Sequence, residues 1–570
     1  MNTITKITKD RRNGQIQEIT GAEAIIKSVI LENTDTVFGY PGGAIMPVYD
    51  ALLPYHKDLN HILVRHEQGA IHAAQGYARA TGKVGVCLAT SGPGATNLIT
   101  GLADAMIDST PLVCITGQVH SHLLGTDAFQ ETDVIGVSMP VTKWNHQVTR
   151  AEEIPEAIAK AFYIAQSGRP GPVVVDITKD AQVSKLPFHY AKCKKVRSYI
   201  PTPTLDQGSI RDAAALINQA KKPFLLVGQG VILSEAEKVL QQFIEKTGIP
   251  FANTILGLSA MPSNHPLNMG MLGMHGNYGP NVKTNECDVL IAVGMRFDDR
   301  VTGDVSRYAK QAKVIHIEID PAEIDKNIPA DVPIIGDAKA ALEALTPLVA
   351  KNEFPQWVKE FHQCLDKEFN AVIKESLFPE KNGITMGEVV RTVSEKLNGE
   401  AILVTDVGQH QMIASRYFRF AKTRSNITSG GLGTMGFALP AALGAKVGAP
   451  DRPVVAIMGD GGFQMTLQEL ATISQEELNV KMIILNNNFL GMVRQWQQLF
   501  FEKRYAFTAM QNPDFVKLAE GFGIEGSRVT QREHLNDKLE SFLNSPHAHL
   551  LEVVVEKEEN VFPMVPSGAS

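Results

Sequence analysis

Short apolar runs recur along the whole chain and are the first feature that indicates its fold. They occupy positions 84–90, 111–117, 172–178, 223–228, 289–294, 313–320, 401–406, 453–460, 480–487 and 549–556. Between most of these runs the apolar residues follow helical spacing, as in GAIHAAQGYARATGK and TLQELATISQEEL. Strands that alternate with helices in this way are typical of βαβ units, so we predict an α/β fold with doubly wound parallel sheets.

Two stretches interrupt the alternation and divide the chain. Residues 183–206 combine basic residues with prolines, and residues 351–384 connect one alternating block to the next. A chain of 570 residues has room for several domains of about 150 residues each. We therefore predict three α/β domains at 15–185, 205–350 and 380–556, followed by a C-terminal tail at 557–570.

Composition and charge exclude several classes of protein. Hydrophobic residues make up 44% of the chain and charged residues 20%, as in ordinary globular domains. No apolar run approaches the ~18 residues of a membrane-spanning helix. The net charge of −7 argues against a nucleic-acid-binding surface. Residues 1–14 lack the apolar segment of a secretion signal, and the five cysteines form no C-x-x-C pair, so we expect a reducing, cytoplasmic location and no zinc site.

Two neighbouring apolar runs stop at side chains that carry oxygen. Asp460 follows the run PVVAIMG, and Asn486 and Asn487 follow the run VKMIIL. Asp460 and Asn487 are separated by 27 positions, so a right-handed crossover would place both at the same edge of a sheet. A carboxylate and an amide oxygen suit Mg²⁺, which also binds the phosphates of a ligand.

The glycines around Asp460 fit a phosphate ligand. Gly459, Gly461 and Gly462 would let the backbone approach phosphate oxygens at the start of a helix, where anions are favoured. The alternative is that GDGG is only a tight turn and that the asparagines at 486–488 cap the next helix. The two parts of the pattern at this spacing favour a joint metal and diphosphate site.

G-D-G followed by N-N resembles the metal and diphosphate motif of the thiamine-diphosphate enzymes. That family also has a glutamate that hydrogen-bonds the aminopyrimidine ring of the cofactor, and the resemblance implies this role for Glu67 in VRHEQGAIHAAQGYARATGK. Without the resemblance, Glu67 would be an ordinary carboxylate favoured by a helix N-terminus. Glu67 and Asp460 belong to different predicted domains. Because the family usually builds its active site from two chains, a homodimer or homotetramer is implied.

The resemblance extends over almost the whole chain. Specific stretches include FGYPGGAIMPVYDAL, SGPGATN, GTDAFQETD, GMLGMHG, GMRFDDRVTG, GGLGTMGFALPAALGA, GDGGFQMTLQEL and LGMVRQWQ. Together they are similar to the large catalytic subunits of the biosynthetic acetohydroxyacid synthases, or acetolactate synthases. The resemblance implies that pyruvate is decarboxylated on thiamine diphosphate and that the hydroxyethyl carbanion joins a second pyruvate or 2-oxobutyrate. The products would be 2-acetolactate or 2-aceto-2-hydroxybutyrate, precursors of valine, leucine and isoleucine. A separate small regulatory subunit is also implied.

The family's functional residues carry over to matching positions. For thiamine diphosphate these are Tyr40, Pro41, Gly42, Gln409, His410, Gly433, Met435, Gly459, Gly461, Gly462 and Met492, and Met435 would be the apolar wedge that bends the cofactor. Magnesium would be bound by the side chains of Asp460 and Asn487 and the carbonyl of Phe489. Catalytic roles fall on Glu67, Gly43, Gln130 and Lys179, and substrate contacts on Phe129, Met274, Arg300 and Trp496. The alternatives are a plain surface cation for Lys179 and a solvated charge run for Arg300.

Flavin-adenine dinucleotide (FAD) is implied by the resemblance alone, because no G-x-G-x-x-G fingerprint supports it. The matching positions are Arg169, Gly228, Gly230, His275, Gly276, Arg296, Asp298, Glu318 and Asp337. The reaction has no net redox step, so this flavin would be structural.

Pyruvate oxidase, glyoxylate carboligase and the flavin-free catabolic acetolactate synthases are the nearest alternatives to a biosynthetic acetolactate synthase. The alternatives from other classes are a nucleotide-binding dehydrogenase and a non-catalytic regulatory module. The chain lacks the glycine fingerprint of the first, and the second would not retain Glu67, Asp460 and Asn487 together.

Overall fold

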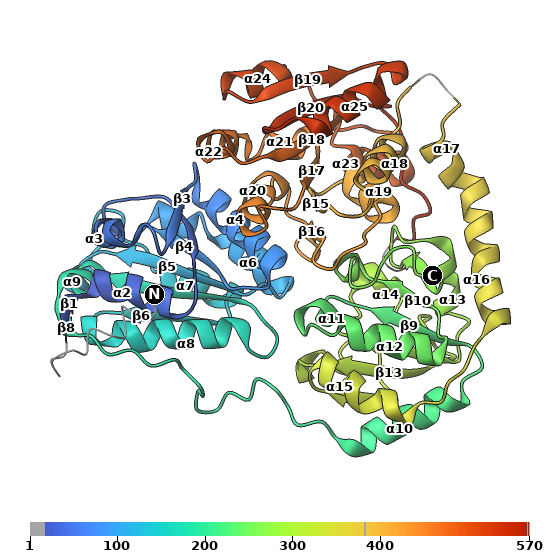
Figure 1. The fold of residues 1–570 in the computed structure, drawn as a ribbon, viewed down its shortest axis with the longest axis horizontal. Coiled ribbons are helices and arrows are strands. Elements are labelled where there is room, and N and C mark those ends of the chain that lie inside the picture. The colour runs from blue at the N-terminus through green and yellow to red at the C-terminus, as the bar shows by residue number, and fades with distance from the viewer. Residues whose placement is uncertain (1–16, 381–382, 567, 569–570) are drawn as a thin grey trace. The chain divides into compact units, whose positions relative to one another are not determined.

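The computed structural model describes residues 17–380, 383–566 and 568. The charged segment 1–14, the first two residues of the predicted N-terminal domain and the last residues of the predicted tail lie outside these ranges. Three six-stranded sheets contain most of the strands, and the strands within them pair in parallel. Helices flank each sheet (Figure 1). The predicted α/β fold with three doubly wound parallel sheets is confirmed, whereas the predicted domain limits stay a prediction.

The first sheet has the strand order β3-β2-β4-β5-β7-β6. Its strands are β2 (Thr36–Gly39), β3 (Asn60–Leu63), β4 (Gly85–Ala89), β5 (Leu112–Gln118), β6 (Trp144–Val148) and β7 (Pro172–Thr178). The main helices are α2 (Gly21–Leu31), α4 (Glu67–Thr81), α6 (Ile99–Ile107) and α8 (Ile154–Gln166). Branched side chains of β5 and β7 pack against α2 and α8, with Ile25, Val113 and Phe162 in one core. A short antiparallel pair, β1 (Glu18–Thr20) with β8 (Lys185–Pro187), stands apart from this sheet.

The second sheet has the order β11-β10-β9-β12-β13-β14. Its strands are β9 (Pro223–Val227), β10 (Phe251–Asn253), β11 (Asn268–Met271), β12 (Val289–Val293), β13 (Lys313–Glu318) and β14 (Val332–Ile335). Helices α10 (Gln207–Gln219), α12 (Glu237–Thr247) and α15 (Ala338–Leu345) share one hydrophobic core with it. The predicted linker at 351–384 is largely helical and begins with α16 (Pro355–Glu368). Trp357 and Phe361 of α16 are buried against Phe224 in a second core, which explains why this linker is ordered as a helix.

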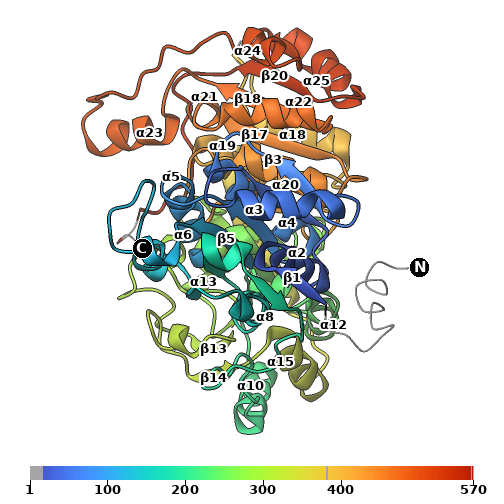
Figure 2. The ribbon, with the colours of Figure 1, turned by 90° about the vertical axis from the view of Figure 1, so that its left-hand side faces the viewer.

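The third sheet has the order β16-β15-β17-β18-β20-β19. Its strands are β15 (Ile402–Thr405), β16 (Asn426–Thr428), β17 (Val454–Gly459), β18 (Val480–Asn486), β19 (Glu525–Val529) and β20 (His549–Val554). The nearby helices include α18 (Met386–Leu397), α19 (Gln409–Tyr417), α23 (Gly491–Phe500), α24 (Phe515–Gly521) and α25 (Leu535–Asn544). In Figure 2, α23 lies at the margin, apart from α24 and α25. This position leaves Val493 and Phe500 of α23 exposed.

The ten predicted apolar runs all became strands inside these sheets. The six edge strands, β3, β6, β11, β14, β16 and β19, were not among the predicted runs, and neither were the short interior strands β2 and β10. An edge strand is only partly covered and so does not need a continuous apolar sequence. In β6, for example, only Val148 is fully buried.

The described residues group into two compact units. The first contains the chain up to Pro201 together with Gly431–Asp451 and Met465–Val480. The second contains Thr202–Gly430, Arg452–Gln464 and the chain from Lys481 onwards. Within the first unit, α4 packs closely on α20 (Ala438–Gly448). A Cβ atom at Gly76 would lie 1.9 Å from the carbonyl oxygen of Ala441, so the close approach of the two helices requires glycine.

None of the helices in the described part of the chain combines the length and apolar character needed to cross a membrane.

Candidate active site

The carboxyl ends of β17 and β18 form a cluster of oxygen-bearing side chains in the second unit. Asp460 begins the short helix α21 (Asp460–Phe463) directly after β17, and Asn486 is the last residue of β18. Asn512 joins the two ends, because its Nδ2 lies 2.6 Å from Asp460 Oδ2 and 3.0 Å from Asn486 Oδ1. The same nitrogen lies 3.2 Å from Asn488 Oδ1. One amide group therefore gathers three oxygens at a single point.

The charge of Asp460 is poorly compensated within this cluster. The residue is 2% exposed, and burial raises its pKa to about 6, although hydrogen bonds from Asn512 and Gly461 act in the opposite direction. Asn487 is equally buried, and its Oδ1 accepts a hydrogen bond from the backbone N–H of Phe489 at 3.1 Å. A hard divalent cation such as Mg²⁺ would be bound by this carboxylate and these amide oxygens. Among the described residues no group of three or more His, Cys, Asp or Glu side chains could hold a metal ion, so amide oxygens would have to contribute to this site.

Glycines and a histidine surround the approach to Asp460. A Cβ atom at Gly459 would lie 2.9 Å from Nδ1 of His410, and one at Gly462 would lie 2.7 Å from a carboxylate oxygen of Asp406. Burial lowers the pKa of His410 to about 4, so its ring is neutral near pH 7. Nε2 of this ring is buried and has no hydrogen-bond partner in the described part of the chain. Because buried polar atoms are normally paired, this nitrogen fits a contact with a bound ligand.

Gln409 connects this cluster to the C-terminal tail. Its Nε2 donates to Oε1 of Gln495 at 2.9 Å and to the carbonyl oxygen of Glu559 at 2.7 Å. Its Oε1 accepts from Nδ2 of Asn487 at 3.4 Å. Gln495 also pairs with both backbone groups of Val561, at 2.9 and 3.1 Å. The tail is therefore packed along α19 and α23 at Glu559 and Val561.

The predicted substrate residues of the second unit lie in two places. Met274 and Arg300 are neighbours, because the backbone N–H of Met274 donates to the carbonyl oxygen of Arg300 at 2.6 Å and Nη1 of Arg300 lies 3.4 Å from Sδ of Met274. The tail reaches the same place, where the N–H of Val565 donates to the carbonyl of Met274 at 2.8 Å. Trp496 lies on α23 and packs on Phe500, with ring centroids 4.9 Å apart.

Glu67 is the first residue of α4 and is 8% exposed. The preceding residue, His66, caps the helix, because its Nδ1 accepts from the N–H of Gln68 at 3.1 Å. One carboxylate oxygen of Glu67, Oε2, accepts from Nδ2 of Asn97 at 2.9 Å. The other faces Gly94, where a Cβ atom would lie 3.1 Å from it. Glu67 is thus held in one orientation by the segment SGPGATN.

A second buried glutamate lies beside the start of α4. Oε1 of Glu469 accepts from the backbone N–H of Arg65 at 3.0 Å, and Oε2 accepts from the hydroxyl of Thr472 at 2.8 Å. A Cβ atom at Gly69 would lie only 2.3 Å from Oε1, so the carboxylate fills the space beside the first turn of the helix. Burial raises the pKa of Glu469 to about 7.

The other residues of the first unit that were predicted for catalysis, substrate or thiamine diphosphate are exposed or partly exposed. Gly42 packs on Thr90, whose hydroxyl accepts from the N–H of Ala44 at 3.2 Å, whereas a Cβ atom at Gly43 would meet open space. Phe129 is 87% exposed. Gln130 follows it with a φ of 59°. Lys179 begins the short helix α9 (Lys179–Val183), Tyr40 is 41% exposed and Pro41 is exposed.

The predicted flavin residues of the second unit gather at the carboxyl edge of the second sheet. Gly228 and Gly230 follow β9 and pack on Gly294 after β12, with the N–H of Gly228 bonded to the carbonyl of Val293 at 2.9 Å. Glu318 ends β13 and is buried. His275, beside Gly276, is buried, and its Nε2 has no hydrogen-bond partner among the described residues.

Some of the predicted flavin residues have structural partners of their own. Asp337 caps α15 by accepting from the N–H of Ala340 at 3.0 Å. Asp298 caps the short helix α14 (Asp299–Thr302), and its Oδ2 lies 3.8 Å from Nη2 of Arg296. In the first unit, Nε of Arg169 donates to the hydroxyl of Ser109 at 2.9 Å. Capping alone would account for Asp298 and Asp337.

Three residues of this site were not found from the sequence. Asn512 lies in the loop MQNPDF and Glu469 lies in LQEL, and neither stretch has a pattern that indicates a contact with distant strands. Asn97 belongs to SGPGATN and Glu469 to GDGGFQMTLQEL, stretches that the resemblance includes, so a signal for these two residues was present.

Comparison with known families agrees with this arrangement. Three family models of thiamine pyrophosphate enzymes match the chain in order: the N-terminal TPP binding domain at residues 19–137, the central domain at 210–345 and the C-terminal TPP binding domain at 406–553. The fold and the matched domains therefore define a thiamine pyrophosphate enzyme, and thiamine diphosphate is the cofactor that these domains bind.

Similar proteins show which kind of thiamine pyrophosphate enzyme the chain resembles. The acetolactate synthase large subunit of Corynebacterium glutamicum is 48% identical over 98% of this chain and 90% of that protein. The acetolactate synthase isozyme 2 large subunit of Escherichia coli K12 is 46% identical over 97% of this chain and 98% of that protein. A probable acetolactate synthase large subunit of Methanocaldococcus jannaschii is 46% identical over 96% and 94%. The chain belongs to the acetolactate synthase large-subunit family. The family and the enzyme class predicted from the sequence are confirmed.

Proposed function

We propose that this chain condenses two 2-oxoacids with loss of carbon dioxide. Pyruvate and a second pyruvate would give 2-acetolactate, and pyruvate and 2-oxobutyrate would give 2-aceto-2-hydroxybutyrate, in the first common step of valine, leucine and isoleucine synthesis. The observation that supports it best is the convergence of Asp460, Asn486 and Asn488 on Asn512 in a chain of this family.

The second unit would bind the metal and the diphosphate. Asp460, Asn487 and the carbonyl of Phe489 are proposed as the Mg²⁺ ligands. A bound cation would compensate the buried charge of Asp460, whose pKa burial raises to about 6. The diphosphate would lie against the backbone of Gly459, Gly461 and Gly462 within reach of His410 and Gln409, and the apolar side chain of Met492 would lie nearby. When bound, thiamine diphosphate would supply a cationic thiazolium ring, whose acidic carbon becomes the nucleophile and whose positive charge takes up the electron pair released by decarboxylation.

Glu67 is the proposed proton-transferring group. Its carboxyl would hold a proton at a nitrogen of the cofactor's aminopyrimidine ring, and Asn97, 2.9 Å from Oε2, would keep the carboxyl oriented for that contact. Gly433 and Met435 would line the ring system, and Tyr40 with the backbone of Pro41 and Gly42 would also contact the cofactor. Because the family usually combines two chains at this point, a homodimer or homotetramer is proposed.

Selection of the second substrate is assigned to Arg300, Trp496 and Met274. A guanidinium group suits the carboxylate of a 2-oxoacid, because its planar fork can form two parallel hydrogen bonds. The indole of Trp496 would pack on the extra methyl group of 2-oxobutyrate, which is worth about 1–3 kcal/mol and so gives preference rather than exclusion. The channel and the reacting carbon would be lined by Gly43, Phe129, Gln130 and Lys179.

FAD is proposed as a structural cofactor at the carboxyl edge of the second sheet. The buried and unpaired Nε2 of His275 and the glycines at 228, 230 and 276 support this site. The remaining proposed contacts are Arg169, Arg296, Asp298, Glu318 and Asp337.

A small regulatory subunit is the proposed partner, since the relatives are named as large subunits. A cytoplasmic location is also proposed, because all five cysteines are free.

Acetolactate formation from pyruvate by the purified chain tests the proposal. Thiamine diphosphate, Mg²⁺ and FAD are omitted in turn. Product that requires all three supports the proposed function and the flavin site. Product that forms without FAD would contradict the flavin site alone. Absence of acetolactate under every condition, with or without added small subunit, would contradict the function.

A further inference from the structure

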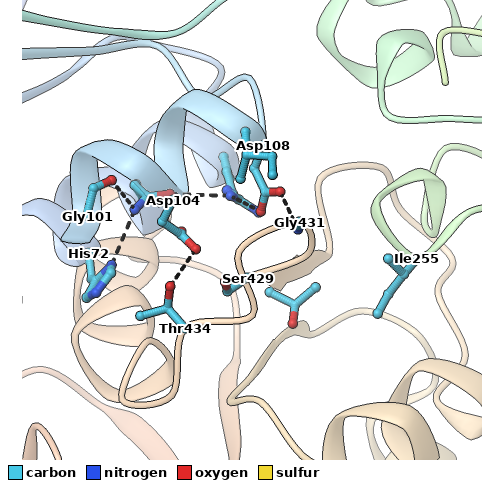
Figure 3. Close-up of polar contacts among 12 residues, drawn as sticks. His72, Gly101, Asp104, Asp108, Ile255, Ser429, Gly431 and Thr434 are labelled. Atoms are coloured by element: carbon cyan, nitrogen blue, oxygen red, sulfur yellow. Dashed lines mark hydrogen bonds and ion pairs between the residues drawn. The ribbon is translucent and has the colours of Figure 1, made fainter. Parts of the chain in front are cut away.

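The loop Gly431–Met435, proposed to line the cofactor, is held by two buried aspartates of the α6 region (Figure 3). Oδ1 of Asp108 accepts from the backbone N–H of Gly431 at 2.7 Å, and Oδ1 of Asp104 accepts from the hydroxyl of Thr434 at 2.9 Å. Both aspartates are fully buried. The loop also packs tightly on α6, because a Cβ atom at Gly431 would lie 2.8 Å from Cγ1 of Ile107. All of these residues belong to the first unit.

Asp108 is connected in turn to the helix that begins with Glu67. Nη2 of Arg79, in the last turn of α4, lies 3.0 Å from Oδ2 of Asp108. The Arg79 side chain is 8% exposed, and its guanidinium lies 5.5 Å from the ring centroid of Phe437, which precedes α20. Gln75, one turn earlier on α4, donates to the carbonyl of Gly101 on α6 at 3.3 Å. The carboxylate of Asp108 therefore joins α4 and the loop through its two oxygens.

We propose that Asp108 is a positioning residue for thiamine diphosphate. Paired with Arg79, its carboxylate holds Gly431 so that the loop carrying Met435 keeps the binding geometry before the cofactor arrives. A preformed loop lowers the cost of ordering on binding, and a charge-assisted hydrogen bond is about twice as strong as a neutral one. This inference rests on the proposed function, because it takes the loop Gly431–Met435 as a cofactor contact.

Asp108→Asn is the informative substitution. The amide can still accept a hydrogen bond from the N–H of Gly431, but it cannot neutralise the charge of Arg79. The connection between α4 and the loop Gly431–Met435 is therefore weakened. We expect the dissociation constant for thiamine diphosphate, measured by titrating the cofactor-free full-length chain at saturating Mg²⁺, to rise about ten- to a hundredfold. The KM for thiamine diphosphate should rise in parallel, while kcat at saturating cofactor changes only a few-fold, since Asp108 is not proposed to touch the reacting atoms.

Glu388→Gln provides a matched control. Oε2 of Glu388 lies 3.0 Å from Nε of Arg532, the same separation as in the Arg79–Asp108 pair, and Glu388 is 8% exposed. Glu388 and Arg532 are not among the residues proposed to bind cofactor. This variant should lose thermal stability, measured as Tm, yet bind thiamine diphosphate within about twofold of the wild type.

A third variant, Thr434→Val, removes only the hydrogen bond to Asp104 and should weaken cofactor binding a few-fold.

The outcomes separate the inference from the function on which it rests. Unchanged binding in Asp108→Asn, or a loss of binding no greater than in Glu388→Gln at an equal change in Tm, would overturn the positioning role and leave the proposed function intact. If Asp108→Asn does not fold, unchanged binding in Thr434→Val overturns the role instead. A wild-type chain that binds no thiamine diphosphate would overturn both.

Discussion

The buried carboxyl group of Glu469 should make the stability of this protein fall as pH rises through neutrality. Glu469 is fully buried and accepts hydrogen bonds from the N–H of Arg65 and the hydroxyl of Thr472. The positive charge of Arg65 offsets the effect of burial only in part. Glu469→Gln retains the size and an acceptor oxygen while removing the charge. The variant therefore isolates the free energy of keeping a carboxylate at this position.

The size of this change in stability follows from the pKa of Glu469. Burial raises the pKa of Glu469 from 4.5 to about 7. At ~1.4 kcal/mol for each pKa unit, this shift corresponds to about 3 kcal/mol. Because the folded state binds the proton more tightly than the unfolded state, the stabilisation is fully present below pH 4.5 and is lost as pH rises through about 7. The glutamine variant does not titrate and should show no such loss from this position.

Thermal unfolding of the cofactor-free wild type and of Glu469→Gln should be compared at intervals between about pH 5 and pH 8. The difference in Tm, wild type minus variant, should decrease as pH rises towards about 7 and level off above it. Glu540→Gln is a suitable control, because Glu540 has a 60% exposed side chain in a surface ion pair with Lys396. Its Tm difference should be small and independent of pH. A constant Tm difference for Glu469→Gln at every pH would refute the reasoning.

Three further predictions concern the proposed site. Glu67→Gln should retain thiamine diphosphate but lose most acetolactate formation, and near-normal turnover would remove Glu67 from proton transfer. Trp496→Leu should lower the preference for 2-oxobutyrate when it competes with pyruvate, as measured by the product ratio; an unchanged ratio would exclude Trp496 from the acceptor site. Asn512→Ala should raise the Mg²⁺ concentration for half-maximal activity about tenfold or more, because a residue that orients metal ligands is lost. Asn370→Ala, at an exposed helix position, is its control and should leave that concentration unchanged.

The sequence predicted the interior of the sheets better than their borders. A strand in the middle of a parallel sheet is covered on both faces, so it needs a continuous apolar run that is visible in the sequence. All residues of β18 and of β7 are buried, as this reasoning requires. An edge strand such as β19, of which only Val529 is fully buried, has no such requirement.

Residues of the candidate site were predictable where they end a strand at a recognisable spacing, or where the surrounding stretch resembles a known family. Asp460 and Asn487 were found because their separation matches one crossover, and Glu67 because a long stretch around it resembles a known family. Asn512 and Glu469 were missed, since each contacts segments that are distant in the sequence. Spacing alone carries no information about such partners.

The amino-acid sequence alone determined the α/β class, the three parallel sheets, the family and the position of the main cofactor motifs. These features depend on local periodicity and on residues that follow one another closely in the chain. The tertiary structure decided which oxygens converge on Asn512, that burial moves the pKa of Glu469 to about 7, and that Asp108 connects Arg79 to Gly431. Burial and long-range hydrogen bonds depend on how distant segments pack, and that packing exists only in the folded chain.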